Sequence, residues 1–356
     1  MVGTRVERLV REKPWLQEGT GELRRRGRFR SATGTAFAVA TLAVAASLAG
    51  CQGPQSTLHV AGREAGEMAS LLWLLVWAAG VIWILVLGTA VYATGISRGP
   101  VDDRVANVMI LAGGVFLPTL VLGGLVTWTV WTMSGLRVPD EQGLRVAVSG
   151  EQWWWRVAYE GPDGNPVASA NEIRLPAGET VTLELSSPDV IHSFWIPSIA
   201  GKMDMIPGRV NELVLEPTKP GIYRGVCAEY CGTSHALMAF SVVVMEPDAF
   251  AAWLAEEARP ASASSAHEGL ALFLENGCGA CHAIRGTEAD GRVGPDLTHV
   301  ASRKSLGAGI LPVTQAALEE WITHTREVKP DARMPPYDML PEAEIATIAG
   351  YLASLK

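Results

Sequence analysis

Two long apolar segments constrain this chain more than any other feature of its sequence. Residues Met68 to Tyr92 and Val105 to Met133 contain no charged side chain. Each is longer than the ~20 residues that a helix needs to cross the hydrocarbon core of a bilayer. The stretch that connects them is charged and too short to form a domain. We therefore expect a transmembrane helical hairpin over residues 68–133, made of spans 68–92 and 105–133.

The second apolar segment carries residues that weaken a helix. Pro118 cannot donate a backbone hydrogen bond, and two glycine pairs lie on either side of it: Gly113, Gly114, Gly123 and Gly124. Neighbouring helices can tolerate such positions by close packing. A hairpin on its own has little need of them, so we expect a larger membrane partner.

The N-terminus has the pattern of a targeting segment. Five arginines between Arg24 and Arg30 precede a small-residue apolar stretch that ends in Leu48-Ala49-Gly50-Cys51. This pattern resembles a bacterial lipoprotein signal. It predicts that residues 1–50 are a signal peptide cleaved before Cys51, that Cys51 carries a diacylglyceryl group, and that residues 51–67 are a short extracytoplasmic segment. The alternatives are an ordinary signal peptide or an uncleaved first helix, with Cys51 an idle thiol.

The signal also predicts the membrane topology. It starts the chain outside the cytoplasm, and two crossings return the chain to that side. Everything after Met133 is therefore expected on the periplasmic side of a bacterial inner membrane, next to membrane lipid. A formal net charge of −8 and the absence of a long basic run argue against nucleic acid as a partner.

The hydrophobic pattern changes after the hairpin. Residues 144–148, 180–185 and 239–244 are short β-type runs, and turns that contain glycine and proline separate them. Several short strands within about a hundred residues predict a β-sandwich, which we assign to residues 140–250.

One loop of this region is rich in metal ligands. Cys227, Cys231, His235 and Met238 lie within twelve residues, and His192 precedes them. Thiolate, imidazole and thioether groups are the ligands that copper prefers. A site with a single copper or a zinc ion is an alternative, and so is a disulfide, which an oxidising compartment permits. The disulfide would leave both histidines and the methionine unexplained.

Three motifs then carry a family resemblance. They are His192-Ser193-Phe194-Trp195-Ile196-Pro197, Asp204-Met205-Ile206-Pro207-Gly208-Arg209 and Cys227-Ala228-Glu229-Tyr230-Cys231-Gly232-Thr233-Ser234-His235-Ala236-Leu237-Met238. From about Met68 to Glu246 the chain resembles subunit II of the haem-copper cytochrome c oxidases. The resemblance implies a cupredoxin-like sandwich with a dinuclear CuA centre. Its implied ligands are the sulfurs of Cys227 and Cys231, His192, His235, Met238 and the Glu229 carbonyl.

The same resemblance implies roles for two further residues, and the sequence departs from the family pattern at one place. The Glu229 side chain would bind a magnesium or manganese ion at the border with the catalytic subunit, and Trp153 would be the residue where electrons enter. On a strand, the run Trp153-Trp154-Trp155 would instead bury Trp154 and expose its neighbours. The family commonly has a glutamate and a tryptophan before the helix proline, but Leu111 and Gly114 stand there. The proton route is therefore in doubt.

The C-terminal part predicts a second module. Residues 255–265 lack apolar periodicity and form a predicted linker. The following region, 266–356, contains Cys278-Gly279-Ala280-Cys281-His282. In an exported chain this CxxCH spacing is typical of covalent haem c attachment through both thiols, with His282 on the iron. A chance match or a redox-active CxxC pair is the alternative.

The layout of this module resembles a class I cytochrome c, an all-α fold. An N-terminal helix, the CxxCH, a Gly294-Pro295-Asp296-Leu297 turn, Met334 before two prolines and a closing helix follow in that order. The resemblance implies Met334 as the sixth iron ligand. Met339, His299 and His324 are competing ligands, which we rank lower.

The sequence therefore predicts a multidomain electron carrier made of a two-helix hairpin, an all-β cupredoxin-like sandwich and an all-α cytochrome c domain. We expect it to pass electrons from a cytochrome c or similar donor, through haem c and CuA, to the haem-copper oxidase subunit I that reduces O2 to water. Other membrane subunits would complete this proton-translocating enzyme. A CuA-type nitric oxide reductase subunit and a copper delivery or storage lipoprotein are the alternatives.

Overall fold

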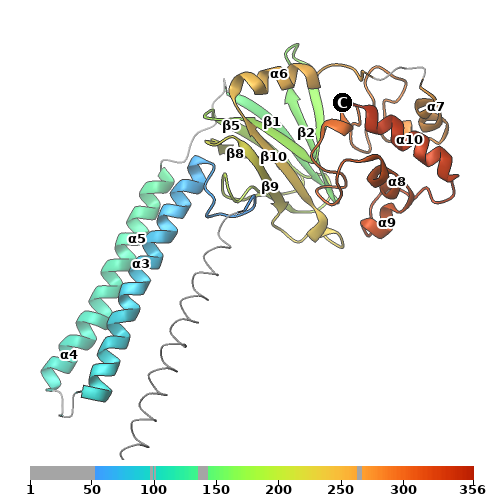
Figure 1. Ribbon diagram of the computed structural model, residues 1–356. Helices are drawn as coiled ribbons and strands as arrows, with labels where there is room; N and C mark the ends of the chain where they lie inside the picture. Colours follow the sequence, from blue (N-terminus) through green and yellow to red (C-terminus); the bar gives the residue numbers. More distant parts are fainter. Residues whose placement is uncertain (1–52, 97–98, 100–101, 135–142, 263–266) are drawn as a thin grey trace, which may run out of the picture. The chain divides into compact units, whose positions relative to one another are not determined.

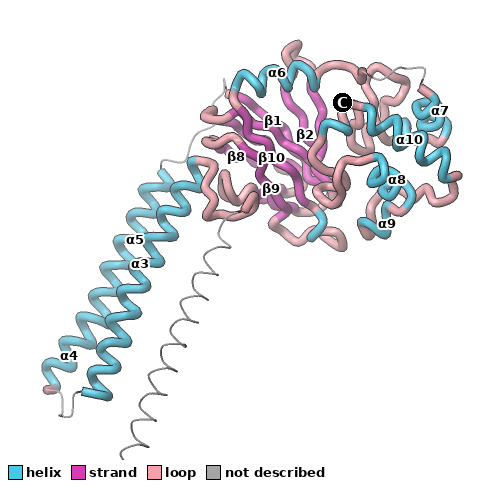
Figure 2. Tube along the Cα trace, viewed as in Figure 1, coloured by secondary structure: helices cyan, strands magenta, loops and turns pink. Residues whose placement is uncertain are grey.

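The computed structural model describes residues 53–96, 99, 102–134, 143–262 and 267–356. The predicted signal peptide and Cys51 lie outside the described residues. Figure 1 shows the helices and strands in chain order, and Figure 2 separates helix from strand by colour.

Two helical stretches match the predicted spans. The first is α3 (Arg63–Val91), continued by a π-helical turn, Tyr92–Ile96; the second is α4 (Asp103–Leu111), a π-helical turn, Ala112–Phe116, and α5 (Leu117–Ser134). Their most apolar eighteen-residue windows have mean hydropathies of 2.5 and 2.2. By length and composition, both stretches can cross a membrane.

The second stretch deviates from a regular helix where the sequence predicted weakness. Pro118 lacks a backbone N–H and cannot bond to the preceding turn. The π-helical turn Ala112–Phe116 lies directly before it, where a wider turn accommodates the missing bond. The Thr119 hydroxyl donates to the Val115 carbonyl (2.7 Å). This hydroxyl is thus hydrogen-bonded within the helix, as a lipid environment would require.

Two five-stranded sheets form the sandwich. The first has the order β3-β2-β1-β5-β8 and the second the order β4-β10-β9-β6-β7. Their bounds are β1 (Leu144–Glu151), β2 (Trp154–Glu160), β3 (Pro166–Ala170), β4 (Glu172–Pro176), β5 (Val181–Ser186), β6 (His192–Trp195), β7 (Met203–Met205), β8 (Asn211–Leu215), β9 (Gly221–Cys227) and β10 (Ala239–Met245). The pairs β1–β5 and β10–β4 are parallel and the others antiparallel. This is the predicted β-sandwich.

Aromatic rings fill the sandwich beside the candidate copper loop. Trp155, Phe194 and Phe240 are fully buried. Trp155 meets both phenylalanines edge to face at 5.7 and 4.9 Å between centroids, and the phenylalanines stack at 4.8 Å. Such contacts add about 0.5–1.5 kcal/mol per pair to the burial of the rings. The alternative in which Trp154 is buried and its neighbours are exposed is wrong: burial alternates along the run, but Trp153 and Trp155 are buried and Trp154 is only half-buried.

The segment before α3 is hydrogen-bonded to the sandwich. Ala61 N–H donates to the Ser198 carbonyl (2.7 Å), and the Ala61 carbonyl accepts from Thr218 N–H (2.7 Å). Ala65 N–H, in the first turn of α3, donates to the Ile199 carbonyl (3.1 Å). These backbone bonds fix the start of the first apolar helix to the sandwich.

The C-terminal region is helical, as predicted. Its elements are α6 (Pro247–Glu257), α7 (Glu268–Glu275), α8 (Gln315–Thr323), α9 (Thr325–Val328), α10 (Glu342–Ser354) and the 3-10 turns Cys278–Ala280 and Val300–Ser302. Helix α10 packs on α7 and α8 around a separate apolar core. Helix α6 continues to Glu257, where the sequence predicted linker from residue 255, because Phe250 and Trp253 on this helix pack against Tyr159 of the sandwich.

A substitution at Gly225, which lies opposite Phe240, tests how tightly the aromatic core is packed. Gly225 on β9 pairs with Phe240 on β10, and a Cβ at position 225 would lie 2.0 Å from Phe240 Cζ. We predict that Gly225→Ala destabilises the protein by at least ~1–3 kcal/mol, because the ring has no space to move into. Thermal unfolding measures the change.

The matched control is Gly350→Ala in α10, where the nearest atom lies 3.7 Å from the added Cβ. Alanine is favoured over glycine within helices, so this variant should be as stable as the wild type or more so. Equal melting temperatures for the wild type and Gly225→Ala would contradict the packing argument.

Candidate copper and haem centres

Strand pairing brings the candidate copper ligands together. His192 begins β6 and Cys227 ends β9, and these strands pair with Phe194 opposite Cys227. The loop after Cys227 closes on itself, since Cys227 N–H donates to the Met238 carbonyl (3.0 Å). His235 lies in a 3-10 turn within this loop. Five candidate ligand residues therefore gather at one end of the sandwich.

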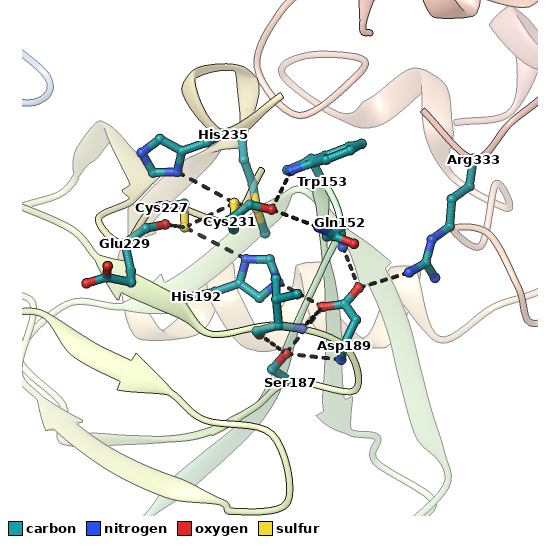
Figure 3. Close-up of polar contacts among 12 residues, drawn as sticks. Gln152, Trp153, Ser187, Asp189, His192, Cys227, Glu229, Cys231, His235 and Arg333 are labelled. Carbon is teal, nitrogen blue, oxygen red and sulfur yellow. Dashed lines mark hydrogen bonds and ion pairs between the residues drawn. The ribbon is translucent and has the colours of Figure 1, made fainter. Parts of the chain in front are cut away.

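The distances between these side chains define a compact cluster (Figure 3). Cys227 Sγ lies 3.8 Å from His192 Nδ1 and 3.1 Å from the Glu229 carbonyl oxygen. Cys231 Sγ lies 3.5 Å from His235 Nδ1 and 3.8 Å from Met238 Sδ. The two sulfurs are 3.9 Å apart. Each cysteine thus has one histidine and one weaker donor beside it.

This donor set fits copper. Both cysteines are free and buried, and their separation is well beyond the ~2.05 Å of a disulfide. The ligand atoms of His192, Cys227 and Cys231 all lie within 4.8 Å of one another. Two thiolates, two imidazoles and a thioether form a soft, nitrogen- and sulfur-rich site of the kind that copper prefers.

Groups around the cluster shift the pKa values of two candidate ligands in opposite directions. A hydrogen bond from the Cys231 thiol lowers the pKa of Cys227, and its thiolate is the form that binds metal. Burial lowers the pKa of His192, but the Cys227 and Asp189 side chains outweigh burial and raise this pKa. Asp189 accepts from His192 Nε2 at 3.0 Å. The other ring nitrogen, Nδ1, is left facing the sulfur.

The turn before β2 supports the second cysteine. The Trp153 indole N–H donates to the Cys231 carbonyl oxygen (3.0 Å), and Gln152 Nε2 donates to the same oxygen (2.8 Å). The expectation that Trp153 lies on an exposed patch is wrong. Its exposed fraction is 8%, and it lines the cavity of the C-terminal domain.

The carbonyl and the carboxylate of Glu229 point in different directions. Its carbonyl oxygen contacts Cys227 Sγ, while its carboxylate points away from the sulfurs into solvent (Figure 3). The geometry is compatible with separate roles for the two groups.

The C-terminal domain contains a cavity around its own motif. Cys278, Cys281, His282 and Met334 all line it. Apolar side chains form most of the remaining wall: Phe273, Leu297, Val300, Leu306, Leu318, Trp321, Ile322, Ile348 and Leu352. Of the competing ligands, Met339 is exposed, and the His299 ring contacts the Arg259 carbonyl outside the cavity wall. His324 is not part of the wall either.

The orientation of His282 suits an iron ligand. Its Nδ1 donates to the Pro295 carbonyl (2.8 Å), which leaves Nε2 with a free lone pair. Burial lowers the pKa of His282 and so keeps the ring neutral. A Cβ at Gly294 would lie 2.6 Å from the ring. The Gly294-Pro295 turn therefore makes room for the histidine and fixes its tautomer.

The cavity also fits the polar edge of a haem. Arg303 Nε and Ser305 Oγ are buried and have no hydrogen-bond partner within the described part of the chain. Both residues line the cavity. A haem bound there would offer carboxylates to these orphaned groups, while its porphyrin would replace solvent against the apolar wall.

The two centres share a boundary. Gln152, Trp153 and Trp154 of the sandwich complete the wall of the cavity. Hydrogen bonds connect the domains around it: Ser234 Oγ to the Pro330 carbonyl (2.6 Å), Lys329 Nζ to the Leu237 carbonyl (2.9 Å), Arg333 Nη2 to Asp189 Oδ2 (3.1 Å), Arg174 Nη2 to the Ser302 carbonyl (3.2 Å) and Lys304 N–H to Glu172 Oε2 (2.6 Å).

Sequence reasoning missed Asp189 and Lys329. A carboxylate three residues before a ligand histidine was the available signal for Asp189. Nothing local marks Lys329, because its partners lie far away in sequence.

These features define a class of protein: an electron carrier in which a copper-binding β-sandwich and a haem-binding cytochrome domain share one chain with two apolar helices. Two family models match the chain in agreement with this class. Cytochrome c oxidase subunit II, periplasmic domain, matches residues 160–245, and cytochrome c matches residues 266–356.

Two individual relatives show to which family the chain belongs. Cytochrome c oxidase subunit 2 of Alkalihalophilus pseudofirmus is 34% identical over 73% of this chain and 78% of its own length. The subunit 2 of Bacillus sp. strain PS3 is 35% identical over 61% of this chain and 64% of its own. This chain belongs to the cytochrome c oxidase subunit 2 family, and hence to an oxidoreductase complex.

One solved structure adds to the comparison. The crystal structure of the periplasmic domain of subunit II of cytochrome oxidase from Bradyrhizobium japonicum is 32% identical. It covers 34% of this chain and 96% of its own, with a TM-score of 0.32. The family assignment rests on the sequence comparisons.

Metal analysis tests the two donor sets separately. We predict that Cys227→Ser removes most of the bound copper and leaves covalent haem unchanged, because the serine hydroxyl is a poor copper ligand. The double variant Cys278→Ala, Cys281→Ala should lose covalent haem and keep copper. Elemental analysis and a haem-staining gel measure both. Full copper occupancy in Cys227→Ser would contradict the assignment.

The buried lysine predicts a dependence of stability on pH. Lys329 is 3% exposed, and burial lowers its pKa to about 7 from the ordinary 10.5. Between these values the unfolded chain holds a proton that the folded chain lacks. Stability should therefore rise with pH above about 7, by at most ~1.4 kcal/mol per pH unit.

Urea unfolding from pH 7 to 10 measures this slope. The variant Lys329→Met should lose the contribution, whereas Lys304→Met, at an exposed lysine of the same domain, should retain it. Identical slopes for the wild type and Lys329→Met would show that Lys329 titrates normally.

Proposed function

We propose that this chain is the subunit through which electrons enter a respiratory terminal oxidase. Electrons would pass from a cytochrome c or similar donor, through haem c and a dinuclear CuA centre, to the subunit I that reduces O2 to water. Bound haem iron and copper supply the one-electron chemistry. The residues of this chain set the positions, surroundings and accessibility of both groups.

One observation carries this proposal. Trp153 lines the haem cavity, and its indole N–H bonds to the carbonyl of Cys231, one of the two copper-loop cysteines. The two donor sets are therefore separated by a single side chain. This arrangement supports the role of Trp153 in electron transfer, here from one centre of the chain to the other.

The geometry supports the proposed ligand roles. The two copper ions would be held by His192, Cys227, Cys231, His235, Met238 and the Glu229 carbonyl, and the haem iron by His282 and Met334, which both line the cavity. The neutral His282 ring and the orphaned Arg303 and Ser305 groups support the haem assignment. The solvent-facing Glu229 carboxylate is available for a magnesium or manganese ion at a subunit border.

The membrane arrangement is part of the proposal. The two apolar helical stretches would cross the cytoplasmic membrane, with both redox modules on the periplasmic side. A cleaved lipoprotein signal ending at Cys51 would add a lipid anchor. The glycines Gly113, Gly114, Gly123 and Gly124 have open space around them within the described chain, which suits close packing against another membrane subunit.

A nitric oxide reductase of the CuA type is the second candidate, because it would use the same two centres. The copper storage alternative has no use for a haem cavity beside the copper loop.

Purification of the intact membrane complex tests the proposal. We predict two copper ions and one covalent haem per chain, a mixed-valence copper EPR signal, and O2 uptake driven by reduced cytochrome c. Consumption of nitric oxide without O2 uptake would favour the second candidate. A complex with one copper ion, or without covalent haem, would contradict the proposed function.

A further inference from the structure

Asp189 lies at the centre of a contact chain that joins the two domains. Its side chain is only 13% exposed. Oδ1 accepts from His192 Nε2 (3.0 Å) and Val190 N–H (2.7 Å); Oδ2 accepts from Gln152 N–H (2.8 Å) and Arg333 Nη2 (3.1 Å) (Figure 3). One carboxylate therefore contacts a candidate copper ligand on one side and the cytochrome domain on the other.

Arg333 extends this series of contacts to the haem cavity. It lines the haem cavity and directly precedes Met334 in sequence. The same segment contacts the copper loop at two more points, through the Pro330 carbonyl and Lys329 Nζ. The segment from Lys329 to Met334 thus contacts both the copper loop and Asp189, the carboxylate beside His192.

The exposure of the Arg333 side chain shows how little its ion pair with Asp189 adds to stability. The Arg333 side chain is 60% exposed, and an ion pair with one exposed partner contributes about 1 kcal/mol or less to stability. Ser234, Lys329 and Glu172 are buried and make interdomain bonds, so Arg333 is not what holds the domains together. Its effect falls on the buried carboxylate, because Asp189 shares its negative charge between Arg333 and His192.

We propose that Asp189 is a positioning residue through which the docked cytochrome domain tunes the copper centre, with Arg333 as the contact that transmits docking to His192. The inference rests on the proposed function. A carboxylate behind a metal-bound histidine fixes the ring and strengthens it as a ligand. Arg333 draws the charge of Asp189 away from His192 and weakens that effect.

Two substitutions should shift the copper centre in opposite directions. Arg333→Gln leaves the full Asp189 charge on His192, which favours oxidised copper, so the reduction potential of the copper centre should fall. Asp189→Asn removes that charge, so the potential should rise and copper binding should weaken about ten- to a hundredfold. In the Asp189→Asn background, Arg333→Gln should have a much smaller effect than in the wild type, because residues that act through one another are not additive.

The experiment uses the intact oxidase complex carrying each variant. The copper potential, the copper EPR hyperfine pattern and copper retention against a chelator are measured. Arg292→Gln is the matched control: it removes one positive charge from the same domain, its side chain is exposed, and its hydrogen bond to Arg156 of the sandwich is made by the carbonyl, which the substitution keeps. Arg333→Lys, which keeps the charge, should restore most of the wild-type potential.

The outcomes separate the two hypotheses. A lowered potential in Arg333→Gln, absent in Arg292→Gln and much reduced in the Asp189→Asn background, supports the coupling. A normal wild-type copper signal with equal potentials in Arg333→Gln and Arg292→Gln overturns the coupling alone. An equal Arg333→Gln shift in both backgrounds overturns it too, because the arginine would then act directly through space. No two-copper signal in the wild type overturns the proposed function and this inference together.

Discussion

The pairing of β6 with β9 is the contact on which the rest of this structure depends. It carries His192 to the edge of the loop that starts at Cys227, although the two residues are 35 positions apart. The backbone bond from Cys227 to Met238 then closes that loop and brings its two ends together. Behind them, the rings of Trp155, Phe194 and Phe240 fill the sandwich and keep both strands in register. A rigid scaffold of this kind keeps ligand positions constant when an electron arrives or leaves.

The second constraint is the surface between the two redox modules. Trp153 of the sandwich is 8% exposed, and it lines the cavity of the cytochrome domain. The sequence predicted a linker between the two domains. The structure adds side-chain and backbone bonds across the boundary, so proximity is set by a defined contact as well as by chain length.

Much of the candidate site could be predicted because its chemistry is local in sequence. Four ligands of the copper loop lie within twelve residues, and the haem motif occupies five. Spacing alone determines which side chains can reach a common metal in these cases. The two apolar helices could also be predicted from the sequence, since length and the absence of charge decide whether a helix can cross a membrane. The tryptophan run was assigned to the wrong face, because alternation by itself does not say which set of side chains points into the core.

The sequence by itself determined the three modules, the two ligand motifs and the apolar helices, because each depends on residues close together in the chain or on a regular hydrophobic period. Only the tertiary structure decided that Trp153 is covered, that Lys329 is buried between the Leu237 and Gly307 carbonyls, and that Asp189 joins His192 to Arg333. Those contacts link residues that are far apart in the chain. Their existence depends on how two folded surfaces meet, and no local pattern of side chains encodes that.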